Sequence, residues 1–208
     1  MRRSFDFTLL PLIEYQGMLI QLDKGVEQAF QEIFQLQETY DRARAALMFF
    51  FGANNKAKAW RNDAYLRAGL NELYSMQDSV ARAFKSSGIK KHSPKISDSR
   101  HPLVHVMYIL RHINVHTVPL PSKVEETTVI FRPNTEAEER TYDIVILSDI
   151  TLEDLLKSKE VKDHYDRPDL ERACEWLMKK QRAFGIAEVF SKGVDAYCAE
   201  VISAYRKQ

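Results

Sequence analysis

Residues 23–52 read DKGVEQAFQEIFQLQETYDRARAALMFFFG, and their apolar side chains recur every three or four positions. This recurrence is typical of a helix with one apolar face, because about 3.6 residues complete a helical turn. The residues that share this spacing are Val26, Phe30, Ile33, Phe34, Leu36, Tyr40, Ala43, Leu47 and Phe50. Gly52 is the kind of residue that follows the end of a helix. We therefore predict one amphipathic helix over residues 24–51.

Two further helices are predicted before residue 120. The second spans residues 55–87 and should pack antiparallel to the first, because only a short Gly-Ala-Asn-Asn turn joins them. The third spans residues 99–117. Asp98 is a suitable cap for its start, and Pro119 stops it by disfavouring helical backbone in the residue that precedes it.

The second half of the sequence predicts more helix after a short β segment. Stretches TTVIF (127–131) and TYDIVIL (141–147) are rich in β-branched residues and predict a hairpin over about residues 127–147. Helical sequence resumes with Thr151 and Asp154, which are spaced as in a capping box. The last helix starts at about Pro168, and a bend is expected near one of two glycines in it. These glycines are Gly185 and Gly193.

The composition agrees with a mostly helical fold, since the 208 residues include only 7 Gly and 7 Pro. We predict an all-α fold, in which an antiparallel helical bundle forms one domain over residues 1–208 and carries the hairpin as an insertion. A formal net charge of +1 gives no global basic field of the kind that attracts nucleic acid. Cys174 and Cys198 are expected to be buried thiols in a cytoplasmic protein, and no signal peptide or membrane segment is expected.

Residues 101–117, HPLVHVMYILRHINVHT, contain four of the six histidines. On a helix, these histidines form a stripe beside an apolar face, and Arg111 lies on the other side of that face. His112 and His116, four residues apart, could ligate one metal ion, but no third ligand or zinc-protease motif accompanies them. The stripe could equally be the polar edge of a core helix. No cofactor is expected.

The segment RHINVH, residues 111–116, resembles the R-x4-6-H motif of the HEPN family, helical bundles that include many metal-independent endoribonucleases. Arg111 matches the arginine, His112 the polar position that follows it, and His116 the terminal histidine. The two long helices before the motif match the family's helical order. The resemblance implies an RNA-cleaving protein with these three site residues and a homodimer with the motifs at a two-fold interface. It also implies a toxin or defence role with a protein partner such as an antitoxin.

An arginine and a histidine are suited to cutting RNA without a metal. Histidine can take a proton from a ribose 2′-hydroxyl, and arginine can hold phosphate oxygens through two parallel hydrogen bonds. However, residues five apart diverge by about 140° on a regular helix, so Arg111 and His116 of one chain do not converge. Either fraying of the helix end at Pro119 or a second subunit has to close this gap, and a second subunit would bring Arg111 of one chain to His116 of the other. His105 is expected to matter little to cleavage.

The loop before the third helix supplies a local positive charge. Its cations are Lys90, Lys91, Lys95 and Arg100, against a single acid, Asp98. Such a run is commonly just a solvated loop, but beside the motif it could bind the RNA backbone. Two alternatives to the ribonuclease remain open at this point, namely a non-catalytic HEPN-like binding or assembly module and a histidine-ligated metal protein.

Overall fold

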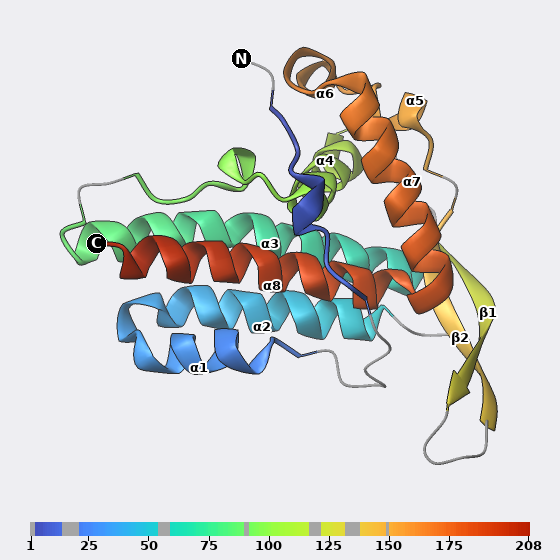
Figure 1. Cartoon of the computed structure of the whole chain (residues 1–208), viewed down its shortest axis with the longest axis horizontal. Coiled ribbons are helices and arrows are strands. Elements are labelled where there is room, and N and C mark those ends of the chain that lie inside the picture. Colours follow the sequence, from blue (N-terminus) through green and yellow to red (C-terminus); the bar gives the residue numbers. More distant parts are fainter. Residues whose placement is uncertain are drawn as a thin grey trace.

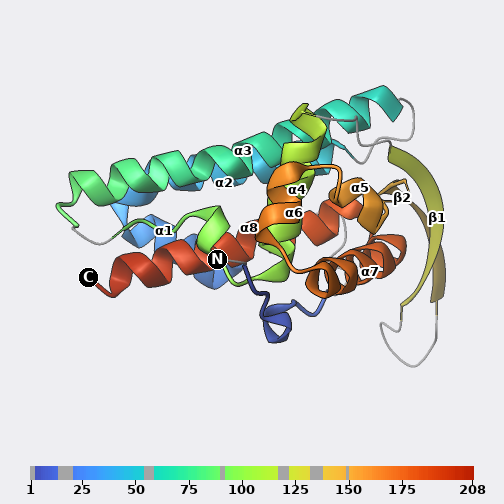
Figure 2. The same cartoon turned by 90° about the horizontal axis from the view of Figure 1, so that it is seen from above.

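The computed structural model describes residues 3–13, 21–53, 59–89, 92–116, 122–131, 138–148 and 150–208, which form a helical bundle with one β-hairpin (Figures 1 and 2). The helices are α1 (Lys24–Glu32), α2 (Gln37–Gly52), α3 (Ala59–Ser86), α4 (Pro102–His116), α5 (Leu152–Leu155), α6 (Lys159–His164), α7 (Arg167–Phe184) and α8 (Ile186–Arg206). The strands are β1 (Ser122–Phe131) and β2 (Glu138–Leu147), and short 3-10 turns are η1 (Phe7–Leu9), η2 (Phe34–Leu36) and η3 (Ile96–Asp98). None of the described helices is long and apolar enough to cross a membrane.

The long helices α2, α3 and α8 lie side by side and form the body of the bundle, while α4 and α7 cross them (Figure 1). The predicted antiparallel packing of α2 against α3 is confirmed. The two helices approach closely at Gly69 of α3, where the ring of Phe50 occupies the place that a Cβ atom would take. Gly193 of α8 has the same role beneath Met107 of α4. A side chain at either crossing would displace a buried neighbour, which is the aromatic ring of Phe50 at Gly69 and the flexible side chain of Met107 at Gly193.

The prediction of one unbroken helix over residues 24–51 is wrong, because α1 ends at Glu32 and η2 separates it from α2. Ile33, between them, has non-helical backbone angles, φ −110° and ψ 85°. Buried Phe30, Ile33 and Leu36 recur every three residues, which is the period of a 3-10 turn rather than of an α-helix. The tighter turn leaves Phe34 82% exposed, although the helical pattern placed it on the apolar face.

The predicted hairpin is confirmed but starts earlier, at Ser122, and pairs antiparallel with register Ser122–Leu147 to Phe131–Glu138. Its base belongs to the core, since Ile144, Val145, Ile146 and Leu147 are buried. The Gln181 side chain of α7 fixes this base: its carbonyl oxygen accepts the Leu147 N–H at 2.9 Å and its amide donates to the Leu147 carbonyl at 3.1 Å. The distal part of the hairpin projects from the bundle (Figure 1).

The last predicted helix is two helices, α7 and α8, separated at Gly185. This residue has φ 82°, a conformation that glycine adopts without steric cost. The bend expected near Gly185 is therefore a full break, whereas Gly193 lies inside α8. The break lets α7 turn away from α8 and cross the end of the bundle beside the hairpin (Figure 1).

Two local predictions in the second half are confirmed. Thr151 and Asp154 form a complete capping box, in which each side chain accepts a hydrogen bond from the other residue's backbone N–H. Cys174 and Cys198 are buried free thiols. Burial raises the pKa of the Cys174 thiol to about 11, so it carries little thiolate at neutral pH.

Candidate functional site

The motif residues 111–116 form the last part of helix α4. The start of the helix differs from the prediction, because Asp98 belongs to η3 and α4 begins at Pro102. Proline suits a first helical position, since its missing N–H would have no partner inside the helix. The predicted apolar face is confirmed and is wider than expected: Val104 and Ile109 are buried together with Leu103, Val106, Met107, Leu110 and Ile113. Only the last part of α4, from Tyr108 onward, includes partly exposed residues.

The side chain of Arg111 points from α4 toward α3. Its Nε donates a hydrogen bond of 3.2 Å to Oδ1 of Asn71. Its guanidinium carbon lies 4.1 Å from the ring centroid of Tyr74, which is within cation–π distance. No described carboxylate forms an ion pair with Arg111. The guanidinium is therefore oriented by an amide and a ring, and its charge is not neutralised by these contacts.

The side chain of His112 points from the other side of α4 toward α6. Its Nε2 lies 3.6 Å from Oε2 of Glu160, and both side chains remain accessible, with 28% and 30% of their surface exposed. Glu160 also accepts a 2.7 Å hydrogen bond from the Tyr108 hydroxyl, and Arg3 Nη2 lies 3.9 Å from it. Burial and this bond to a carboxylate raise the pKa of Tyr108 well above its usual value. Tyr108 therefore stays protonated and acts as a donor.

Tyr74 and Tyr108 connect the two sides of this region. Their rings are stacked with centroids 6.0 Å apart and an interplanar angle of 25°. Arg111 lies over Tyr74, and Glu160 is bonded to Tyr108, so these four residues and His112 form one continuous surface near the end of α4. We call these five residues the α4 patch. It combines a cation, two aromatic rings and a carboxylate–imidazole pair.

His105 lies below the patch in a polar network. Its Nε2 is bonded to the carbonyl oxygen of Ser99, which can only accept, so Nε2 carries the proton and Nδ1 is the acceptor. The hydroxyl of Tyr165 then donates to Nδ1 over 2.9 Å and accepts from Nη1 of Arg3 over 2.8 Å. Phe5 covers the imidazole at a centroid distance of 5.0 Å. Both nitrogens of His105 are used, so this histidine is a structural residue and not a free metal ligand.

The remaining predicted site residues that the structure describes are divided between the two ends of α4. His116 is the last residue of the helix. Lys90 and Lys91 lie outside the described residues. Lys95 and Arg100 are exposed beside the start of α4, where Arg100 Nη2 lies 3.9 Å from Oδ2 of Asp6. Arg100 and Arg111 are 11 positions apart, which is roughly 16 Å along a helix, so one chain does not place them on one patch.

The sequence did not indicate Arg3, Tyr74, Tyr108, Glu160 or Tyr165 as members of a site. Tyr108 lies on α4, three residues before Arg111, whereas the other four come from segments far from the motif, and none belongs to a motif of its own. The metal alternative finds no support in the described residues, where no three histidine, cysteine or acidic side chains gather as ligands. Two imidazoles of the stripe have other contacts, since His105 belongs to a hydrogen-bond network and His112 has a carboxylate neighbour.

We expect neutral, buried His105 to make the protein less stable in acid. Burial lowers the pKa of this imidazole from 6.5 to about 4, so protonation favours the unfolded state. The stability that depends on the neutral ring is complete above pH 6.5 and is lost as the pH falls from 6.5 to 4, by about 1.4 kcal/mol per pH unit. His101 shifts in the same direction, while Asp195, whose pKa is raised by burial to about 6, acts in the opposite direction.

The contribution of His105 is measured by comparing the wild type with His105→Gln, which keeps a donor and an acceptor but does not titrate. Urea unfolding at several pH values from 7 to 4 gives the free energy of unfolding of each. The variant should lose stability less steeply, by up to about 1.4 kcal/mol per pH unit. Equal slopes would show that His105 has the same pKa in the folded and unfolded protein.

Comparisons of this chain with protein-family models, with curated proteins and with solved structures found no significant match.

Proposed function

We propose that the protein is a HEPN-like, metal-independent endoribonuclease in which Arg111 holds the phosphate and His116 transfers protons. The observation that carries the proposal is the environment of Arg111. Tyr74 covers one face of the guanidinium and Asn71 takes Nε, so the two terminal amino groups have no partner among the described residues. An arginine held in this way can bind two phosphate oxygens at once, because its fork is already oriented.

The aromatic part of the α4 patch supports single-stranded RNA as the substrate. Bases of a single strand are free to stack on tyrosine rings, and Tyr74 and Tyr108 are partly exposed beside Arg111. Phosphate and base would then contact adjacent side chains. His112 and Glu160 would lie at the other side of the bound strand, where Nε2 of the imidazole is 3.6 Å from a carboxylate oxygen.

In the proposed reaction, the neutral imidazole of His116 takes the proton from a ribose 2′-hydroxyl. The 2′-oxygen attacks the adjacent phosphorus, and the bond between phosphorus and the 5′-oxygen breaks. The imidazole of His116, now protonated, gives a proton to this leaving oxygen. The products are a 2′,3′-cyclic phosphate and a free 5′-hydroxyl. Arg111 stabilises the extra negative charge of the phosphorane between these steps. Since residues five apart diverge on one helix, a homodimer would pair Arg111 of one chain with His116 of the other.

The test is cleavage of a labelled single-stranded RNA in excess EDTA. We expect cleavage to continue with EDTA and to stop when the RNA carries 2′-O-methyl riboses, because the nucleophile is then blocked. DNA of the same sequence should remain intact. Cleavage that stops with EDTA would instead favour a metal-dependent reaction, and cleavage of the methylated RNA would exclude attack by the 2′-hydroxyl. A toxin or defence role with an antitoxin partner belongs to the same proposal and would be tested only after cleavage is seen.

A second candidate is a HEPN-like module that binds RNA or assembles with a partner without catalysis. The partial burial of Arg111 between Asn71 and Tyr74 favours it, since this contact is also a stable packing arrangement for a purely structural arginine. Salt-dependent RNA binding without cleavage, weakened by Arg111→Ala, would support this candidate over the nuclease.

A further inference from the structure

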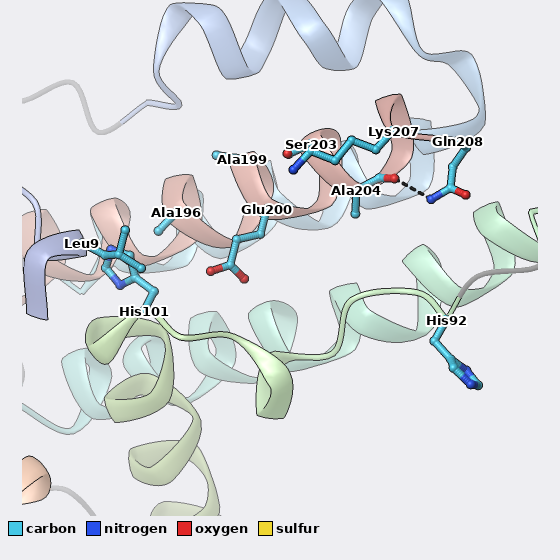
Figure 3. A pocket seen from close by; sticks show the side chains of 10 residues that line it. All are labelled: Leu9, His92, His101, Ala196, Ala199, Glu200, Ser203, Ala204, Lys207 and Gln208. Carbon is cyan, nitrogen blue, oxygen red and sulfur yellow. Dashed lines mark hydrogen bonds between the residues drawn. The ribbon is translucent and has the colours of Figure 1, made fainter. Parts of the chain in front are cut away.

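The β-hairpin has a face whose charge has one sign. The groove along the second half of α8, in contrast, is lined by both Glu200 and Lys207, so its charge is mixed (Figure 3). Residues that lie directly opposite each other in an antiparallel pair place their side chains on the same face. On the face that includes Val124 and Ile130, all charged residues are acids, namely Glu126, Asp143 and Glu139.

The contact between Gln181 and Leu147 shows which backbone groups of the hairpin point outward. The single N–H of Leu147 is used by the Gln181 side chain, so Leu147 and its partner Ser122 form a pair without a backbone hydrogen bond between them. Such pairs alternate with hydrogen-bonded pairs, and the N–H and C=O groups of their residues point away from the neighbouring strand. Counting in twos from Ser122, we call the next four outward-directed residues the β1 edge: Val124, Glu126, Thr128 and Ile130.

The β1 edge has no backbone partner among the described residues. The sheet consists of β1 and β2 alone, and no described backbone hydrogen bond outside their ladder involves β1. Figure 2 shows β1 at the margin of the molecule, on the side away from the bundle. The four residues of the edge are exposed, Val124 to 38% and Ile130 to 56%. An edge of this kind is a template to which a further strand can be added.

The usual protections against strand addition are missing from β1. The strand has 10 residues and no proline, whereas strands of about 5–6 residues are the commonest. It pairs with β2 residue for residue, without a bulge. Its one lysine, Lys123, lies at the base of the hairpin, and Nζ is 2.8 Å from Oε1 of Glu125. Proline, bulges and lysines are common devices that block a free edge, so the acids are the main feature that limits what β1 can pair with.

These acids favour a basic strand. Glu126 lies directly opposite Asp143, and like charges at opposite positions destabilise an antiparallel pair. No described cation forms an ion pair with Glu126. A lysine or arginine on an added strand would offset this repulsion, whereas an acidic strand or the phosphates of RNA would increase it. A second copy of β1 would bring a further Glu125 and Glu126 to the same edge.

We propose that the β1 edge binds an extended, basic segment of a partner protein, which adds to the hairpin as a third strand and places a lysine or arginine opposite Glu126. Backbone hydrogen bonds to the β1 edge would supply affinity that does not depend on the sequence of the segment. The acids would select its charge, while Val124 and Ile130 would give apolar contacts at both ends. The inference is independent of the proposed nuclease, because the β1 edge shares no residue with the α4 patch.

The probe is the peptide acetyl-Val-Thr-Lys-Thr-Lys-Thr-Val-amide, whose sequence reads the same in both directions and therefore suits parallel and antiparallel addition. It is titrated into the ¹⁵N-labelled full chain at low ionic strength, and amide shifts and hydrogen exchange are followed by NMR. We expect saturable shifts in β1 and exchange slower by about tenfold or more at the amides of the β1 edge, which gain an acceptor. The amides of Glu125 and Thr127, which point toward β2, should change little. No saturable binding, or binding without this alternation, would overturn the proposal.

Two changes of charge test the selection for a basic segment. The same peptide with glutamate in place of both lysines should not bind the wild type. Glu126→Lys should weaken binding of the lysine peptide about tenfold or more and allow the glutamate peptide to bind. Asp78→Lys makes the same change of charge at an exposed position of α3 and should leave the preference unchanged. Equal binding of the two peptides to the wild type would overturn the proposal.

Thr128→Pro tests the edge itself. The N–H of Thr128 points outward, so proline removes no bond to β2, and proline is tolerated on an edge strand. The variant should keep the hairpin, seen from its amide shifts, and lose peptide affinity by about tenfold or more. Wild-type affinity with the hairpin intact would overturn the proposal. Slow exchange at the β1 edge of the free protein that becomes faster on dilution would also overturn it, because a second copy of the chain would then cover the edge.

Discussion

Replacing His116 by alanine is expected to lower EDTA-resistant RNA cleavage by about 10²- to 10⁴-fold, the range that a lost general acid or base produces. The fold should be unaffected, because His116 is the last residue of α4, and a helix end tolerates alanine. Cleavage is measured on labelled single-stranded RNA, and the helical content by circular dichroism. His164→Ala is the matched control, since it removes an exposed histidine from the last turn of α6 and should keep full activity.

Arg111→Lys is the companion variant at the other half of the proposed site. Lysine keeps the positive charge but loses the fork that grips two oxygens, and it also loses Nε, which bonds Asn71. We expect a loss of cleavage of about 10²-fold or more, comparable to removal of one transition-state donor. If lysine at this position supported wild-type cleavage, the role of Arg111 would be reduced to a general positive charge.

A mixture of the two inactive variants tests the dimer directly. If each site combines Arg111 of one chain with His116 of its partner, an Arg111→Lys/His116→Ala heterodimer has one intact site and one doubly altered site. After subunit exchange, an equal mixture should recover about a quarter of wild-type cleavage, because about half of the dimers are mixed and each has one of its two sites intact. No recovery in a mixture shown to exchange subunits would place both residues of a site on one chain.

Gly69→Val is expected to cause the largest loss of stability, about 3 kcal/mol in the free energy of unfolding. The position of its Cβ atom is taken by the ring of Phe50, which is completely buried and rigid. The helices α2 and α3 would have to separate to admit a side chain. Urea unfolding followed by circular dichroism measures the effect.

Gly193→Ala is the informative comparison for Gly69→Val. The nearest atom there is the sulfur of Met107, which can move because methionine is flexible. Alanine also favours a helix over glycine by about 0.5–1 kcal/mol, so the net loss should be small. Equal losses in the two variants would mean that the α2–α3 crossing adapts as easily as the α4–α8 crossing.

The sequence predicted those parts of the fold that depend on local patterns. Helical periodicity and the positions of glycine and proline indicated α3, α4 and the hairpin, and the turn of about 100° per residue placed Arg111 opposite the histidine stripe. The break at Ile33 was missed because the three-residue spacing of Phe30, Ile33 and Leu36 was read as part of a helical pattern. This change of spacing, from an alternation of three and four residues to three alone, separates one long helix from two shorter ones.

The candidate site was predicted only in part, because its contacts join residues far apart in the sequence. The histidine stripe was expected at a half-exposed edge, but His105 is fully buried, since Phe5 and Tyr165 cover it. Nothing in the local sequence of α4 shows that the N-terminal segment lies over this helix. Glu160 was missed for the same reason, as its place beside His112 depends on how α6 packs.

The contact between Arg3 and Tyr165 has a consequence for the order of folding during synthesis. The two residues are 162 positions apart, and Asp23 meets Asp195 across a similar separation of 172. A ribosome adds about 5–20 residues per second, so Tyr165 is synthesised roughly 8–30 s after Arg3. Contacts between residues far apart in the sequence also form more slowly than local ones. The helices α2 and α3 can pair early on the nascent chain, whereas the network around His105 and Glu160 has to form among the last parts of the molecule.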